Sequence, residues 1–153
     1  MTLADVDAVM AIEQAAYAFA WTRGNVVDSV LAGHRAELLC DAHGELLGYS
    51  IASWGVEEMH LLNLTVAPDH QGRGHALVLL DALVREAREG GALQLWLEVR
   101  PSNERARRVY ERYGFVHVGV RRGYYPAAAG LREDALVMRL ALASARKSAD
   151  GGD

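Results

Sequence analysis

The sequence offers little for cross-linking or redox chemistry, because it contains a single cysteine. One cysteine cannot form an internal disulfide. Cys40 closes the apolar run Leu38-Leu39-Cys40, and no histidine stands beside it as a base. We therefore expect a buried structural thiol rather than a catalytic nucleophile. The six histidines include no pair spaced as H-x-x-x-H and have no cysteine at ligand spacing, so no metal site is expected.

Long hydrophobic runs are also missing. No apolar stretch approaches the roughly 20 residues that span a membrane. Residues 1–7 carry no basic segment followed by an apolar one, so no secretory signal is expected. These absences predict a cytoplasmic protein that does not bind membranes. A composition with 51% hydrophobic and 24% charged residues is globular, and 153 residues is the size of one domain.

An excess of positive charge is absent as well, since the formal net charge is -4. Direct binding to nucleic acid is therefore not expected. A local group of arginines does occur within one predicted helix, at Arg105, Arg107, Arg108 and Arg112. A solvated helix face is the expected role of this group, and contact with phosphate or the ribosome is the alternative.

The periodicity of the apolar residues predicts one α/β domain over residues 1–142. Thr2 and Asp5 resemble a capping arrangement for a helix that runs to about Ala18. The tail, residues 143–153, has no apolar pattern and is expected to be disordered. A mixed, mostly antiparallel sheet with helices on both faces follows from the element order. Further helices are expected near 25–32, 74–89 and 104–113, and strands near 37–40, 46–54, 59–66, 93–99, 115–122 and 135–142.

A glycine-rich loop joins the strand at 59–66 to the helix at 74–89. Its sequence, Gln71-Gly72-Arg73-Gly74-His75-Ala76, brings backbone N–H groups together with the positive end of a helix dipole. Such a loop favours a phosphate or pyrophosphate, to which Arg73 adds charge. The loop is neither a Walker A motif nor a G-x-G-x-x-G turn. Taken alone, it could equally be a connection that needs glycine only for its turn.

Two residues in the second half of the chain are candidates for acid/base chemistry. In the strand at 93–99, Glu98 lies on the face opposite Leu97. An acid in an otherwise apolar strand is either a functional group or a structural partner of Arg100 or of the arginine-rich helix. Tyr110 lies on the apolar stripe of the helix at 104–113, a position more typical of a core tyrosine.

The pattern Gln71-x-x-Gly74-x-Ala76 after a strand resembles the acyl-CoA pyrophosphate loop of the GNAT N-acetyltransferase superfamily. Within it, the strings Leu-Trp-Leu-Glu-Val-Arg at 95–100 and Arg-Arg-Gly-Tyr-Tyr-Pro at 121–126 resemble the bacterial ribosomal-protein alanine N-acetyltransferases. The segments 61–66, 102–103, 109–115 and 132–135 add to this likeness. The likeness covers residues 2 to about 142.

The resemblance implies transfer of an acetyl group from acetyl-CoA to the α-amine of an alanine-initiated small-subunit ribosomal protein, without a metal. It makes Glu98 the general base and Tyr110 the general acid. The cofactor contacts that it implies are Leu64, Thr65, Val66, Gln71, Gly72, Arg73, Gly74, His75, Ala76, Asn103 and Tyr110. The implied substrate contacts are Trp21, Glu58, Asn63, Tyr124 and Tyr125.

Several alternatives accompany this interpretation. Glu57 and Glu58 are rival bases, and the acceptor could be a lysine side chain or a small amine. A non-catalytic acyl-CoA-binding module is a further possibility. Relatives usually begin with an extra strand, which is expected to be missing here. The strand at 37–40 is therefore predicted to be an uncovered sheet edge that can pair with another copy, giving a monomer or a weak homodimer.

Overall fold

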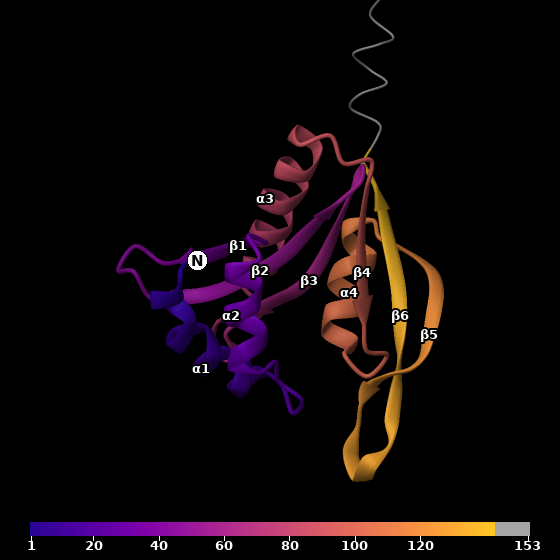
Figure 1. Cartoon of the computed structure of the whole chain (residues 1–153), viewed down its shortest axis with the longest axis horizontal. Coiled ribbons are helices and arrows are strands. Elements are labelled where there is room, and N and C mark those ends of the chain that lie inside the picture. Colours follow the sequence, from indigo (N-terminus) through magenta and orange to yellow (C-terminus); the bar gives the residue numbers. More distant parts are fainter. Residues whose placement is uncertain (143–153) are drawn as a thin grey trace, which may run out of the picture. The chain divides into compact units, whose positions relative to one another are not determined.

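The structure is a computed structural model, and it describes residues 1–142. Figure 1 labels its α-helices and strands, and the strands form a six-stranded sheet in the order β1-β2-β3-β4-β6-β5. The pairs β1–β2, β4–β6 and β5–β6 are antiparallel. The predicted class, a mostly antiparallel α/β fold, is confirmed. The elements are η1 (Leu3–Asp5), α1 (Val6–Ala16), α2 (Arg23–Leu31), β1 (Arg35–Cys40), β2 (Leu46–Gly55), β3 (Glu58–Val66), η2 (Pro68–His70), α3 (His75–Glu89), β4 (Gln94–Val99), α4 (Glu104–Tyr113), β5 (Val116–Pro126), η3 (Ala128–Gly130) and β6 (Arg132–Ala141).

The described residues group into two compact units. The N-terminal unit comprises Met1–Trp54 and Leu61–Leu80. The C-terminal unit comprises Gly55–His60 and the described residues from Asp81 onward. The predicted disordered tail, 143–153, lies outside the described residues. No helix within residues 1–142 is long and apolar enough to cross a membrane.

The N-terminal unit begins with the capping arrangement expected from the sequence. The backbone N–H of Thr2 donates to Asp5 Oδ2 over 2.7 Å, which satisfies a donor that the helix itself cannot. The helix ends at Ala16 rather than Ala18, because Tyr17 takes an extended conformation. In Figure 1, α1 and α2 lie side by side. The apolar side chains that they bury pack with Tyr49 of β2.

Helices contact both faces of β2 within this unit. Tyr49 packs against α1 and α2, whereas its neighbour Gly48 faces the other way. A Cβ atom added at Gly48 would lie 3.3 Å from Leu79 Cδ1 of α3. It would also lie 2.6 Å from the Thr65 carbonyl oxygen. The predicted covering of both faces is thus found in this unit, and Gly48 is needed for the close approach of the β3 backbone.

The strand β1 lies at one end of the strand order, as predicted for an edge strand. One of its carbonyls, that of Ala36, accepts from the amino group of Met1 over 3.0 Å. The prediction of a buried Cys40 thiol is wrong, because Cys40 is exposed. The register of β1 with β2 shifts between Leu39 and Cys40, and the edge strand has no second neighbour to cover its last residue. Pairing of this edge with another copy stays a prediction.

In the C-terminal unit, the observed bounds of a helix agree with the predicted ones where the helix has strong capping residues. Along β4, Leu95, Leu97 and Val99 are buried, while the residues between them are half-buried. The helix α4 spans Glu104–Tyr113 as predicted, because Asn103 caps its start and Gly114 ends it at φ 118°. The hairpin formed by β5 and β6 is longer than predicted. Arg132 extends it by donating to the carbonyls of Gly123 and Tyr124 over 2.6 and 2.9 Å.

Candidate active site

The loop from Gln71 to Ala76 lies in the N-terminal unit and has the geometry of an anion site. Gly72 and Gly74 have φ values of 78° and 84°, which favour glycine. A Cβ atom added at either glycine would meet no atom within 4 Å, so this side of the loop is open to a ligand. The helix α3 starts at His75, and its first N–H groups have no partner within the helix. Backbone donors and the helix dipole therefore fit a pyrophosphate.

Side chains around this loop are engaged in ways that hold its shape. Gln71 Nε2 donates to the Val66 carbonyl over 3.2 Å, which ties the loop to the end of β3. Arg73 Nη1 lies 3.4 Å from His70 Nδ1, and His70 Nε2 lies 3.6 Å from Glu45 Oε1. The Gln71 side chain is thus a brace for the loop, whereas exposed Arg73 supplies positive charge beside it.

The segment of β3 that was predicted to contact the cofactor lies deep in the N-terminal unit. Thr65 is 2% exposed and Asn63 is 8% exposed. The Leu64 carbonyl accepts from the Tyr17 hydroxyl over 3.3 Å. The Asn63 amide donates to Glu13 Oε1 over 2.8 Å and the Thr65 hydroxyl donates to Asn63 Oδ1 over 2.7 Å, so both side chains are engaged within the unit.

Trp21, a predicted substrate contact, borders a hollow in the N-terminal unit. The hollow has a volume of about 520 Å³ and lies between α1 and the segment that leads into α2. Its lining is partly apolar and includes the ion pair between Asp7 and Arg23. The lining residues are Asp7, Met10, Ala11, Gln14, Ala20, Trp21, Thr22 and Arg23.

Glu98 lies on β4 in the C-terminal unit, with its side chain 12% exposed. His60 Nε2 lies 3.3 Å from Glu98 Oε2, and Arg121 Nη1 lies 3.4 Å from Glu98 Oε1. The hydrogen bond from His60 lowers the pKa of Glu98; burial acts in the opposite direction, and the charges of His60 and Arg121 lower it further. The carboxylate is therefore ionised at neutral pH and can accept a proton.

Tyr110 and Asn103 lie on and before α4 in the same unit. The Tyr110 ring is 7% exposed and makes an edge contact with Phe115, with ring centroids 5.6 Å apart. Its ring is therefore a core ring, as its position on the apolar stripe indicates. The side-chain oxygen of Asn103 accepts from the Ala106 N–H over 3.2 Å, which starts the helix. Both residues thus have structural roles beside the functional ones predicted for them.

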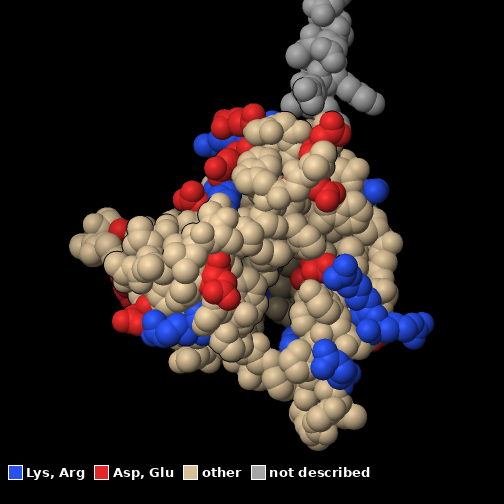
Figure 2. Space-filling view, in the orientation of Figure 1, with Lys and Arg blue, Asp and Glu red and all other residues tan. Residues whose placement is uncertain are grey.

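Tyr124 and Tyr125 stack on each other near the tip of the β5–β6 hairpin, with ring centroids 4.9 Å apart. Arg121 lies over the Tyr124 ring and Arg100 over the Tyr125 ring. Burial, followed by the charge of Glu98, raises the pKa of Tyr125 to about 12, so its hydroxyl remains a donor at neutral pH. Figure 2 shows basic side chains gathered over this hairpin. The structure thus brings Glu98 and the two predicted tyrosines into one electrostatic group.

The rival bases lie at the β2–β3 turn. Glu57 has a φ of 56° in the turn itself, and Glu58 begins β3; both are exposed. Their exposure distinguishes them from Glu98, whose side chain is 12% exposed. Among residues 1–142, no three His, Cys, Asp or Glu side chains gather in a group that could hold a metal ion.

Sequence reasoning missed His60 and Arg121 as partners of Glu98. His60 is 38 positions away along the chain, so no local spacing indicates the contact. One signal was available for His60, which alternates with the buried residues Met59 and Leu61 on β3. A polar residue at that register lies on the opposite face of the strand.

Comparison with known proteins gives concordant matches. The sequence model of the acetyltransferase (GNAT) family matches residues 6–115. The ribosomal protein bS18-alanine N-acetyltransferase of Salmonella typhimurium is 37% identical over 144 residues, covering 92% of this chain and 93% of that protein. The same enzyme of Haemophilus ducreyi is 35% identical over 138 residues, covering 90% and 94%.

A solved structure gives the same result. The crystal structure of the ribosomal-protein-S18-alanine N-acetyltransferase from Escherichia coli superposes with a TM-score of 0.84 at 35% identity. The match covers 93% of this chain and 90% of that one. The chain belongs to the acetyltransferase (GNAT) family and is an acetyl-CoA-dependent protein N-acetyltransferase.

Proposed function

We propose that this enzyme acetylates the N-terminal α-amine of an alanine-initiated ribosomal protein of the bS18 kind, with Glu98 as general base. The observation that carries the proposal is the environment of Glu98, a half-buried carboxylate kept ionised by His60 and Arg121. The names of the relatives, which are 35% and 37% identical over most of the chain, support the choice of acceptor.

The energetics of proton removal favour an α-amine as the acceptor. An α-amine with a pKa near 7.8 needs about 1.1 kcal/mol to become neutral at pH 7, whereas a lysine near 10.4 needs about 4.6 kcal/mol. One carboxylate, acting directly or through a water molecule, is a sufficient base for the first of these. The single ionised Glu98 therefore suits an N-terminal amine better than a lysine side chain.

In the proposed reaction, Glu98 takes the proton that the amine loses as its nitrogen attacks the thioester carbonyl carbon. The carbon–sulfur bond then breaks, and the Tyr110 hydroxyl gives its proton to the departing thiolate. Backbone N–H groups of residues 64–66 would stabilise the oxyanion, which is worth roughly 3–4 kcal/mol in comparable sites. Trp21, Glu58, Asn63, Tyr124 and Tyr125 would line the acceptor site.

The loop from Gln71 to Ala76 is the proposed holder of the acetyl-CoA pyrophosphate. The open space beside its two glycines of positive φ and the first turn of α3 suit a doubly charged group. The charge of Arg73 adds to this attraction. Leu64, Thr65 and Val66 would offer backbone groups to the pantetheine arm, with Asn103 near the thioester.

The test is thiol release from acetyl-CoA with the full-length protein and a short alanine-initiated peptide. The same peptide acetylated in advance and a peptide whose only amine is a lysine serve as comparisons. We expect turnover confined to the free α-amine. Turnover only with lysine or small amines would overturn the proposed acceptor and keep the enzyme class, and acetyl-CoA binding without turnover would favour a binding module.

Variants test the roles of the two catalytic candidates. Glu98→Gln and Tyr110→Phe should each lower kcat by about 10²- to 10⁴-fold, the usual contribution of a general acid or base. Glu111→Gln and Tyr113→Phe are matched controls, because both side chains are in α4 and contact His117 and Asp81 respectively. The controls should retain kcat within about twofold. Loss of activity in Glu58→Gln, with Glu98→Gln active, would transfer the base role to Glu58.

A further inference from the structure

A buried carboxylate in the N-terminal unit has no role in the reaction proposed above. Glu13 of α1 is 1% exposed, although glutamate is almost never fully buried unless its charge is paired or hydrogen-bonded. It occupies the same helix stripe as the buried residues Val6, Val9 and Met10. A charge in such a place needs a specific set of donors.

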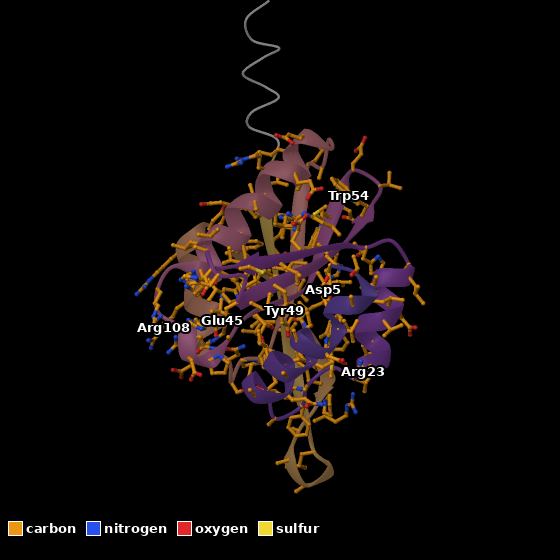
Figure 3. The ribbon with its side chains drawn as sticks, turned by 90° about the vertical axis from the view of Figure 1, so that its left-hand side faces the viewer. Asp5, Arg23, Glu45, Tyr49, Trp54 and Arg108 are labelled. Atoms are coloured by element: carbon orange, nitrogen blue, oxygen red, sulfur yellow. The ribbon has the colours of Figure 1, made fainter. Side chains whose placement is uncertain are left out.

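Three donors from different parts of the unit surround the Glu13 carboxylate. Tyr49 of β2, labelled in Figure 3, donates its hydroxyl to Oε1 over 2.6 Å. Asn63 of β3 donates from Nδ2 to the same oxygen over 2.8 Å. The backbone N–H of Trp21 donates to Oε2 over 2.9 Å. The two oxygens thus face different structures, since Oε1 faces the sheet and Oε2 faces the loop that follows α1.

The hydrogen bonds continue from Asn63 to Thr65 and then to Tyr17. The Thr65 hydroxyl donates its only proton to Asn63 Oδ1 over 2.7 Å, so in its 2.8 Å contact with the Tyr17 hydroxyl it accepts; Tyr17 shares that proton with the Leu64 carbonyl at 3.3 Å. Burial raises the pKa of Tyr17 and of Tyr49, and the hydrogen bond to Glu13 adds to the effect at Tyr49. Both phenols therefore remain donors at neutral pH. A run of hydrogen bonds leads from Tyr17 through Thr65 and Asn63 to Glu13.

The loop held by Glu13 has other anchors: the Tyr17 hydroxyl bonds to Thr65, Trp21 packs against the core cluster of α1 and α2, and Thr22 caps α2. Residues 17–22, between the end of α1 and the start of α2, have no helix or strand of their own. Trp21 also borders the hollow described above, and its backbone N–H is held by Glu13 Oε2. A hydrogen bond from a neutral N–H to a carboxylate oxygen is stronger than one to a neutral oxygen. The bond from the Trp21 N–H to Glu13 Oε2 is of this stronger kind.

We infer that Glu13 is a positioning residue, which fixes the Trp21 loop on the acceptor side to residues 63–65 of β3 on the cofactor side. The inference rests on the proposed function, in which Trp21 lines the acceptor site and β3 holds acetyl-CoA. Loss of Glu13 frees the loop, and the enzyme then binds its acceptor less well. The pyrophosphate loop does not depend on these contacts, so acetyl-CoA binding changes much less.

The experiment compares Glu13→Met, Glu13→Gln and Tyr49→Phe in the full-length protein. Methionine keeps the length of the side chain but accepts no hydrogen bond of comparable strength. Glutamine can turn its amide oxygen towards the Trp21 N–H, so it is the conservative variant. Tyr49→Phe removes a donor from the same carboxylate and leaves the Trp21 bond intact, so it serves as the control for a loss of stability alone.

We expect Glu13→Met to raise the KM for the peptide by about tenfold or more, which is the size of a lost hydrogen bond to a charged group. The KM for acetyl-CoA should stay within about twofold. Glu13→Gln should recover most of the loss, and Tyr49→Phe should lower Tm without changing the peptide KM. An unchanged peptide KM in Glu13→Met, or an equal rise in Tyr49→Phe, overturns the inference.

A second measurement covers failure of Glu13→Met to fold. Hydrogen exchange at the Trp21 amide should be faster in Glu13→Gln than in the unaltered protein, because a neutral acceptor holds the proton less strongly. It should be unchanged in Tyr49→Phe, and equal rates in all three proteins overturn the inference. If the enzyme prefers a lysine or small amine, the proposed acceptor fails, and the KM for that amine then tests Glu13.

Discussion

Replacing Gly48 by alanine tests how closely the β2 and β3 backbones must approach for the cofactor strand to keep its shape. The added Cβ would lie 2.6 Å from the Thr65 carbonyl oxygen and 3.2 Å from Val66 Cα. Both neighbours are backbone atoms, so no flexible side chain can move aside. The strand β3 must shift in the segment proposed to receive the pantetheine arm.

The expected loss of stability follows from two opposing effects. Overpacking costs typically about 1–3 kcal/mol, and a clash with backbone belongs in the upper part of that range. The lower entropy of the unfolded alanine chain offsets about 0.4–1 kcal/mol of this cost. A net destabilisation of about 1–2.5 kcal/mol remains. For a domain of this size it lowers Tm by about 2–10 °C.

The assay combines thermal unfolding with acetyl-CoA binding and turnover. Gly48→Ala should lower kcat/KM for acetyl-CoA by about tenfold, because the displaced backbone is part of the proposed site. Gly24→Ala is the control, since its Cβ would meet only Thr22 Oγ1 at 3.6 Å. It should stabilise α2 by up to about 1 kcal/mol and leave turnover unchanged. A Gly48→Ala protein with unaltered Tm and turnover would refute the reasoning.

Four further predictions follow from individual residues and contacts. His60→Ala should raise the pKa of Glu98, so the acid limb of the kcat/KM profile should move to higher pH; an unmoved limb would count against the pairing. Glu98 has a lower pKa in the folded protein than an ordinary glutamate, so its ionised form stabilises the fold. This contribution is fully present at pH values above the ordinary glutamate pKa, and it is lost as the pH falls through the lowered pKa of Glu98. Glu133→Gln should cost about 1–2 kcal/mol in a denaturant titration and reduce kcat, because Glu133 holds Ser102 and Arg100 at the start of α4. Cys40 should react with a thiol reagent in the native protein at nearly the rate of the unfolded chain, and strong protection would contradict its exposure.

The sequence predicted those features that short-range patterns control. The bounds of α4 agree at both ends, because a capping asparagine and a glycine of positive φ are local signals. The alternation along β4 correctly assigned Leu97 to the core and Glu98 to the other face. The hairpin of β5 and β6 was predicted too short, since its extension depends on Arg132, whose partners are eight and nine residues away.

The features that were missed depend on contacts between distant segments. The partnership of His60 with Glu98 joins two strands, and Glu13 gathers donors that are 8, 36 and 50 residues away. For Glu13 a signal was present, because it follows Val9 by four positions and Met10 by three on an apolar stripe. Cys40 was misread because an apolar run predicts burial only where a strand is covered, and β1 is an edge strand.

The donors around each carboxylate, rather than its residue type, separate catalytic from structural glutamates. Glu13 is 1% exposed and accepts from three donors, one of which is a backbone group that cannot turn away. A substrate amine therefore has no access to it. Within residues 1–142, Glu98 is held by two side chains that are themselves 37% and 59% exposed, those of His60 and Arg121. Such partners can move aside while keeping the carboxylate ionised, which is the condition for accepting a proton from an incoming amine.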